Sequence, residues 1–218
     1  MGVKRAALFI SVFLIIFLCR SVYLYDLSFE KASAINELDE ISVKIEQKIL
    51  TDEEAYKILV LFPRTKHSNS GLSWKNHVLN IVEVWKLYVR KYPTSPFVSH
   101  AYLRMAEWYL HIRIGDDKPL TLDSETKSAD PKYRAEALFL LNMALKNFYD
   151  YDQLSYHLSD VGEDAFARDD KVGAVALNLR AYHFPAYRCK DLARLKKEFS
   201  QYPSAKDALK NVSRKECG

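Results

Sequence analysis

Residues 130–150 of the chain are DPKYRAEALFLLNMALKNFYD, and this stretch decides the class of fold. Asp130 followed by Pro131 is a helix start signal, because the aspartate caps free N–H groups and proline fits the first helical position. From Ala137 to Phe148, apolar side chains lie on nearly every side of the predicted helix. We therefore expect this helix to be the most buried one in the protein.

Similar helix signals continue in both directions from this stretch. Thr51 and Glu54 form a capping box. Ser95-Pro96 repeats the start signal, and Gly115 matches a helix stop. Between such signals, apolar residues recur at steps of three and four, which indicates amphipathic helices. The predicted helices span residues 29–50, 52–62, 74–92, 96–114, 131–150, 153–168, 171–184, 189–201 and 204–215.

Glycine is scarce in this sequence. Six glycines occur among 218 residues, and no two of them lie within six positions of each other. Dinucleotide-binding turns and phosphate loops need closely spaced glycines, so the sequence excludes both. β-Sandwiches and barrels need frequent glycine-rich turns, which are also missing. The net charge of +4 is too small to indicate nucleic-acid binding. These features predict an all-α fold without a cofactor.

The first 25 residues carry a targeting pattern. Lys4 and Arg5 precede an uncharged apolar run at residues 6–19, which has the length of a signal-peptide core. In one interpretation, cleavage after Ser21 releases the mature chain. In the other, which we favour, residues 6–25 stay in a membrane and residues 1–25 act as an uncleaved signal anchor. Both interpretations place the rest of the chain outside the cytoplasm, in the periplasm if the source is bacterial.

The three cysteines fit such a destination. Cys19 lies in the targeting segment, and the bulky residues before it argue against lipoprotein processing. If the domain is extracytoplasmic, Cys189 and Cys217 can form a disulfide that closes a loop of about 28 residues, worth ~3–4 kcal/mol. Two unpaired thiols are the alternative, since Cys217 is the penultimate residue. No C-x-x-C motif occurs, so zinc binding has no sequence support.

The predicted helices share a repeated spacing of small and large residues. Small residues let the two helices of a hairpin approach closely, large ones fill the gaps, and a proline ends the second helix. One unit begins at residue 105 and continues after a polar insertion at residues 115–130, and a second covers residues 161–185. The positions are Met105, Ala106, Tyr109, Ala137, Leu141 and Ala144 in the first unit and Val161, Gly162, Ala165, Ala174, Ala181 and Pro185 in the second.

This spacing resembles the tetratricopeptide repeat. The phrases at residues 92–95 (Tyr-Pro-Thr-Ser) and 202–205 (Tyr-Pro-Ser-Ala) are similar to the repeats of bacterial periplasmic tetratricopeptide proteins, including the β-barrel-assembly lipoprotein family. The resemblance covers roughly residues 52–210. It implies antiparallel helical hairpins stacked as a short solenoid over residues 51–218. Before them, the apolar steps of three and four at residues 35–49 predict an amphipathic juxtamembrane helix at residues 26–50. An unrelated helical bundle is the alternative fold.

The resemblance also implies a binding site, because such solenoids hold partner segments in a concave groove lined by the first helix of each hairpin. With Ala106 and Gly162 aligned, the groove positions mix aromatic rings with carboxylates and imidazoles, which suits a protein partner. The alternative is that the large apolar members are core residues of neighbouring hairpins. The predicted groove residues are His100, Leu103, Glu107, Leu110, His111, Tyr156, Ser159, Glu163 and Phe166.

Charge is distributed unevenly along the chain. Residues 26–54 hold nine acidic against three basic side chains, and residues 188–218 hold nine basic against four acidic. The basic end can face anionic lipid or an acidic surface, although we favour a solvated face. The acidic segment can pair with a like helix or dock on the repeats.

The sequence contains no strong sign of an enzyme. No H-E-x-x-H or G-x-S-x-G motif occurs. His100, Glu107 and His111 are the best candidate metal ligands, but a fourth ligand would have to come from elsewhere, so we predict no metal and no catalytic residue. We expect a non-catalytic scaffold that binds an envelope protein or peptide segment. The alternative is an accessory subunit that positions a catalytic partner in an envelope enzyme complex.

Overall fold

The computed structural model describes residues 37–62, 73–112, 130–147, 170–211 and 217, and all regular structure in these ranges is helical. The all-α prediction is therefore confirmed for the described residues. A helical stretch at residues 37–46 is followed by α2 (Asp52–Leu61), α3 (Trp74–Lys91), α4 (Val98–Leu110), α5 (Pro131–Asn147), α6 (Val172–His183), the 3-10 turn η3 (Pro185–Tyr187), α7 (Arg188–Glu198) and α8 (Pro203–Asn211).

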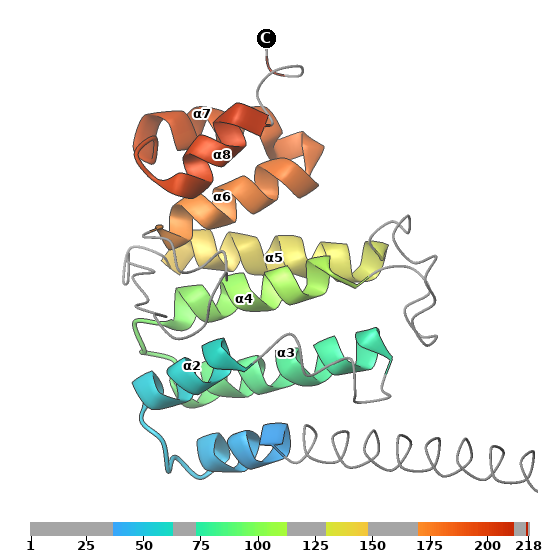
Figure 1. The fold of residues 1–218 in the computed structure, drawn as a ribbon, viewed down its shortest axis with the longest axis vertical. Coiled ribbons are helices and arrows are strands. Elements are labelled where there is room, and N and C mark those ends of the chain that lie inside the picture. The colour runs from blue at the N-terminus through green and yellow to red at the C-terminus, as the bar shows by residue number, and fades with distance from the viewer. Residues whose placement is uncertain (1–36, 63–72, 113–129, 148–169, 212–216, 218) are drawn as a thin grey trace, which may run out of the picture.

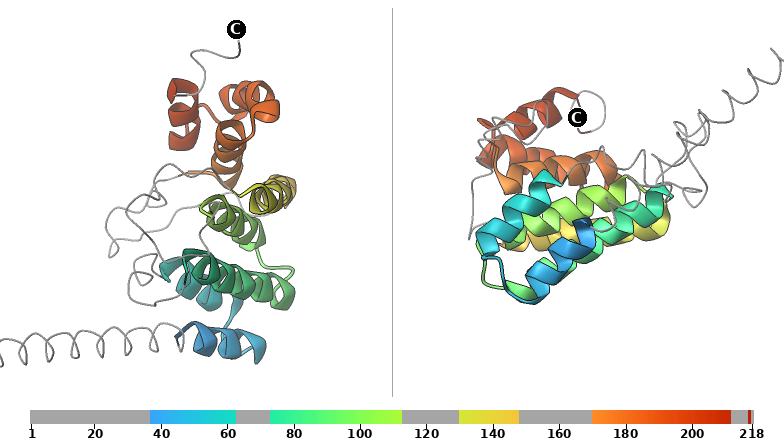
Figure 2. Two further views of the ribbon diagram at one scale, coloured as in Figure 1. Left: turned by 90° about the vertical axis from the view of Figure 1, so that its right-hand side faces the viewer. Right: turned by 60° about the horizontal axis from the view of Figure 1, so that its bottom comes forward.

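The helices follow one another along the long axis of the molecule in chain order (Figures 1 and 2). The stretch at residues 37–46 lies at one end, and α7 and α8 lie at the other. The most extensive helix–helix packing joins α4 to α5, followed by α6 to α7 and α5 to α6. The core consequently runs through the stack as one continuous cluster of buried apolar side chains.

Two of the predicted start signals act as expected. The Thr51 hydroxyl accepts a hydrogen bond from the Glu54 N–H at 3.2 Å, and a Glu54 carboxylate oxygen accepts one from the Thr51 N–H at 2.9 Å. Asp130 accepts from the Lys132 N–H at 2.9 Å, and α5 begins at Pro131. Both helices therefore begin where the sequence predicts.

The third start signal was placed two residues too early. Helix α4 begins at Val98, because residues 92–97 form turns in which Ser95 N–H donates to Tyr92 O and Val98 N–H donates to Ser95 O. The Ser95 hydroxyl accepts from the Phe97 N–H at 3.3 Å and shares a hydrogen bond of 2.8 Å with the Tyr88 hydroxyl. Pro96 lies in this turn, ahead of the helix.

The helix predicted at residues 29–50 ends at residue 46. Lys48 takes a left-handed backbone conformation with φ 53°, and Ile49 N–H donates to Lys44 O at 2.9 Å. This is the hydrogen-bond pattern that closes a helix after a left-handed residue. Glycine or asparagine usually marks such a helix end, so the lysine at position 48 did not indicate in the sequence that the helix ends here. Residues 29–36 lie outside the described part of the chain.

The most buried helix is α4, and the prediction for α5 was wrong. Helix α5 keeps a solvent-facing stripe that includes Ala135, Glu136 and Phe139, the last with 59% of its surface exposed. Helix α4 contacts α3, α5 and α6, and a side chain of α2 also reaches it. Its buried residues are Ser99, His100, Ala101, Leu103, Arg104, Met105, Ala106, Glu107, Trp108, Tyr109 and Leu110.

A backbone hydrogen bond joins the described residues on the two sides of residues 113–129. Asp130 N–H donates to Ile112 O at 3.1 Å, so the last residue described before the insertion contacts the first residue described after it. Helices α4 and α5 can therefore pack as neighbours despite the 17 residues at 113–129 between them. Those residues, including Gly115, lie outside the described part of the chain.

A buried arginine joins three helical elements near the C-terminal end. Arg180 of α6 makes two hydrogen bonds to the Asp191 carboxylate of α7, at 2.7 and 2.6 Å, and one to the Asn142 side-chain oxygen of α5 at 2.6 Å. Its guanidinium also lies 4.8 Å from the centre of the Tyr187 ring. The Asp191 side chain is 1% exposed, so this pair works in a largely dry environment.

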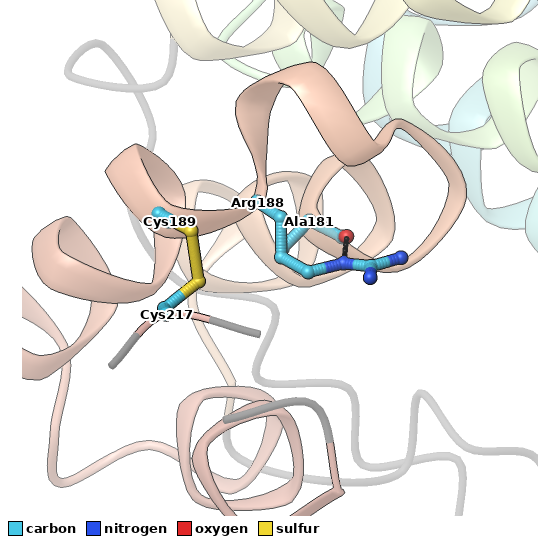
Figure 3. Close-up of a disulfide and its surroundings, with 4 residues drawn as sticks. All are labelled: Ala181, Arg188, Cys189 and Cys217. Carbon is cyan, nitrogen blue, oxygen red and sulfur yellow. Dashed lines mark hydrogen bonds between the residues drawn. A yellow bond between two sulfur atoms is a disulfide. The ribbon is translucent and has the colours of Figure 1, made fainter. Parts of the chain in front are cut away.

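Two further contacts close the C-terminal end. The Asp170 carboxylate, just before α6, accepts hydrogen bonds from the Ser204 N–H at 2.8 Å and the Ser204 hydroxyl at the start of α8. Cys189 and Cys217 form a disulfide, with Cα atoms 5.4 Å apart (Figure 3). Of the two alternatives for these cysteines, a disulfide or two unpaired thiols, the structure contains the disulfide.

No helix in the described ranges is long and apolar enough to cross a membrane. The predicted targeting segment at residues 1–25 lies outside those ranges.

We predict that Asp191→Ala lowers the free energy of unfolding by about 3 kcal/mol or more, because it leaves the Arg180 guanidinium largely buried without its carboxylate. The measurement is urea denaturation followed by circular dichroism. The matched control is Glu198→Ala, which removes the more exposed Arg194–Glu198 pair on the same helix and should cost less than about 1 kcal/mol. Equal losses in the two variants would contradict this ranking.

Candidate interaction site on helix α4

Three polar side chains form a stripe along α4. His100, Arg104 and Glu107 follow one another at steps of four and three, which places them on one face of the helix. All three are buried, with exposed fractions of 0%, 5% and 9%. Charged residues are rarely buried to this extent without partners. The stripe is therefore the most unusual polar feature of the described structure.

The N-terminal member of the stripe is held by α2. The Tyr56 hydroxyl and His100 Nδ1 share a hydrogen bond, and both side chains are fully buried. The Tyr56 ring also stacks on Phe97, with ring centres 4.3 Å apart and planes at 10°. Trp85 and Tyr88 of α3 approach the same ring at 6.0 and 6.3 Å. Tyr56 thus connects α2 to α3 and α4 through one aromatic cluster.

The middle of the stripe carries an ion pair. Arg104 Nη1 lies 3.3 Å from Glu107 Oε2, and the two side chains are 6% and 11% exposed. A buried pair of this kind loses hydration, and its attraction offsets that cost only when the geometry and further hydrogen bonds are good. The pair is therefore not by itself evidence of a large contribution to the stability of the fold.

A second aromatic cluster lies at the C-terminal end of α4. Trp74 Nε1 donates to the His111 carbonyl oxygen at 3.1 Å, which satisfies one of the free carbonyls at the helix end. The Trp74 ring lies 6.0 Å from Trp108 and 5.8 Å from His77. His111 itself is exposed, directly after this cluster.

The environment of His100 favours the neutral imidazole. Burial lowers the pKa of His100 well below its ordinary value of 6.5, and the neighbouring Arg104 guanidinium lowers it further. Burial also lowers the pKa of His183, with a smaller contribution from Arg134. Neutral His100 can exchange hydrogen bonds with Tyr56, but it does not act as a cation at neutral pH.

The structure places most of the predicted groove residues of α4 in the interior. His100 and Leu103 are 0% exposed, and Glu107 and Leu110 are 9% exposed. Only His111 is exposed. The apolar members Leu103 and Leu110 therefore match the core alternative. The predicted residues of the next unit, Tyr156, Ser159, Glu163 and Phe166, lie outside the described part of the chain, so binding through a groove stays a prediction.

Sequence reasoning missed two members of this site. Tyr56 was assigned no role, because its pairing with His100 joins positions 44 residues apart. Arg104 was passed over although it lies one turn from His100 and one turn from Glu107, a spacing that could have identified it.

The described residues hold no group of three or more His, Cys, Asp or Glu side chains arranged to bind a metal ion. Of the three candidate ligands on α4, His100 is fully buried and His111 is exposed, so they do not share one environment.

The disulfide lies away from this stripe, at the C-terminal end of the molecule. Figure 3 shows Cys189, in the first turn of α7, joined to Cys217. The adjacent Arg188 Nε donates to the Ala181 carbonyl oxygen of α6 at 3.1 Å. The bond therefore ties the C-terminal tail to the junction of α6 and α7.

Comparisons of the chain with protein-family models, with curated proteins and with solved structures find no match. Assignment to a repeat family is therefore a proposal.

We predict that His100→Asn flattens the pH dependence of stability. Because the folded pKa of His100 is below its unfolded value, the unfolded chain takes up the proton first, and stability is lost as the pH falls below about 6.5. The contribution is at most ~1.4 kcal/mol per pH unit. Chemical denaturation between about pH 7.5 and pH 5 measures it for each variant.

Asparagine keeps a hydrogen-bonding group for Tyr56, so the variant should stay folded at neutral pH. The control is His111→Asn at the exposed end of the same helix, which should leave the slope unchanged. If His100→Asn and the wild type lose stability in parallel below pH 6.5, the neutral assignment of His100 is wrong.

Proposed function

We propose that the chain is a non-catalytic protein-binding scaffold of the tetratricopeptide-repeat type, exported or membrane-anchored, with its helical domain on the extracytoplasmic side. The observation that carries this proposal is the close packing of α4 against α5 in the predicted register. Ala106, Ala137 and Ala144, the small positions of the first predicted unit, are all 0% exposed. Burial of small residues at these spacings is what close approach of two repeat helices requires.

The second predicted unit supports the same proposal in its described half. Ala174 and Ala181 of α6 are 0% exposed, and Pro185 follows two residues after the helix ends at His183. Small residues inside the helix and a proline after it are the features expected of the second helix of a repeat. The first half of this unit, at residues 161–165, lies outside the described part of the chain.

Stacked repeats bind partners along the side formed by the first helix of each hairpin. Helices α2 and α4 hold these positions, and Tyr56 joins them through Phe97 and His100. Because the polar stripe on α4 is buried, its role in the proposal is to stiffen the platform. In the proposal, the partner segment contacts His111 at the exposed end of α4.

Export is proposed from two features that are distant in sequence. The N-terminal pattern of Lys4, Arg5 and the apolar run at residues 6–19 is typical of a targeting segment. The Cys189–Cys217 disulfide fits an oxidising compartment, since cytosolic proteins keep their thiols reduced. The proposed location is the periplasmic or outer face of the membrane, with residues 6–25 as anchor.

We predict that a photo-crosslinking amino acid at position 111 joins the chain to one discrete partner in living cells. The matched control is the same amino acid at position 139, because Phe139 is aromatic, 59% exposed and on α5 rather than α4. Adducts are separated on gels and identified by mass spectrometry. A discrete adduct from position 111 alone supports the scaffold, and an enzyme as partner would favour the accessory-subunit alternative. Identical adduct patterns from both positions would contradict the proposed binding side.

We predict that Cys189 and Cys217 are oxidised in the cell. Cells are quenched with acid, and free thiols are labelled with a maleimide polymer that retards the chain on a gel. The wild type should carry no label on these two cysteines, whereas Cys189→Ser should expose Cys217 and gain one label. Full labelling of both in the wild type would contradict an extracytoplasmic location.

A further inference from the structure

The two ends of the stack carry opposite charge. Residues 37–62 hold seven acidic and three basic side chains, a net charge of −4. Residues 188–211 hold seven basic and three acidic side chains, a net charge of +4. Figures 1 and 2 show these segments at opposite ends of the long axis. We call them the acidic end and the basic end.

The charge of the basic end is available to a partner. Of its acidic residues, Asp191 is buried against Arg180, and Glu198 pairs with Arg194. The pair of Asp191 with Arg180 lies in the interior, so the Asp191 carboxylate does not neutralise the exposed lysines. The exposed cations of α7 and α8 are Lys190, Lys196, Lys197, Lys206 and Lys210.

The acidic end combines its charge with exposed apolar surface. Leu38, Ile41 and Ile45 turn the helix at residues 37–46 toward the core. Its opposite face carries Asp39, Glu40 and Glu46 around Val43, which is 50% exposed. Ile49, just after the helix, is 62% exposed. In a helical stack each element is covered by the next, so an outer helix with exposed aliphatic side chains presents a surface that a further element can cover.

We propose that the acidic end of one chain binds the basic end of a second copy, head to tail. The two ends of one molecule carry net charges of equal size and opposite sign. This favours a second copy of the chain as the binding partner, because each copy has both an acidic end and a basic end. Such a contact is heterologous, so it continues from copy to copy and forms short linear chains. The proposal does not depend on partner binding at α4.

The contact is weak and sensitive to salt. Exposed ion pairs contribute little individually and are screened within roughly 8 Å at physiological ionic strength. Assembly therefore depends on high local concentration, which anchoring of residues 6–25 in a membrane would supply. Anionic lipid is the competing occupant of the basic end, and the experiment below separates the two.

The test is a charge swap in the full-length chain, studied by sedimentation velocity in a non-ionic detergent. One variant carries Lys196→Glu and Lys197→Glu, and the other carries Asp39→Lys and Glu40→Lys. All four side chains are exposed, so both variants should melt like the wild type. The wild type should self-associate at ~0.05 M NaCl and weaken at least tenfold by ~0.5 M.

Each variant alone should lose self-association at least tenfold, since the two substitutions bring the net charge of one end from +4 or −4 to zero. An equimolar mixture should recover one-to-one pairs, because the unaltered acidic end of the variant with Lys196→Glu and Lys197→Glu can bind the unaltered basic end of the other variant. The matched control is Lys146→Glu, an exposed cation on α5 away from both ends, which should associate like the wild type.

Three results would overturn the proposal. The first is a wild type that stays monomeric at low salt. The second is that the variant with Asp39→Lys and Glu40→Lys loses self-association and the equimolar mixture does not restore it. That result would indicate that two acidic ends bind each other. The third is a monomeric wild type that sediments with anionic vesicles through Lys196 and Lys197, which would assign the basic end to a membrane.

Discussion

The structure depends on the burial of a single helix. Helix α4 is enclosed by α3, α5 and α6 and by the Tyr56 side chain of α2, so its polar groups have little access to water. Buried polar groups cost free energy unless they find partners inside the protein. The contacts of His100 with Tyr56 and of Arg104 with Glu107 meet part of this requirement. The Tyr56–His100 contact also constrains where α2 lies relative to α4, since a hydrogen bond requires a defined distance and angle.

The C-terminal end is held by a different set of interactions. Arg180 connects α5, α6 and α7, Asp170 connects the start of α6 to the start of α8, and a disulfide fixes the tail. These are polar or covalent connections, whereas the middle of the stack is held mainly by apolar and aromatic packing. Small terminal units have little core of their own, so such connections replace the burial that a neighbour would supply.

This distribution of polar groups supports the proposed scaffold. His100, Arg104 and Glu107 of α4 are buried and contact other side chains, and burial lowers the pKa of His100 so that it is neutral. Exposed charge gathers instead at the two ends of the long axis, with opposite sign. The middle of the stack buries titratable side chains of α4, and its two ends carry complementary charges. This arrangement is consistent with a molecule that connects other molecules. The proposed functions follow from that arrangement.

The sequence by itself determined the helical class, most of the helix limits and the small positions inside the stack. Capping at Thr51 and Asp130 is local chemistry, and the spacing of Ala106, Ala137 and Ala144 follows from helix periodicity. Three features came only from the tertiary structure. The first is the burial of α4 rather than α5, which depends on how many neighbouring helices each one has. The second is the Tyr56–His100 contact, which joins positions that are distant in the sequence. The third is the end of a helix at Lys48, where the residue type is unusual for a left-handed backbone conformation. The burial of the predicted groove residues His100, Leu103, Glu107 and Leu110 on α4 also depends on packing. Periodicity identifies which residues share a face, but only packing decides whether that face meets solvent or another helix.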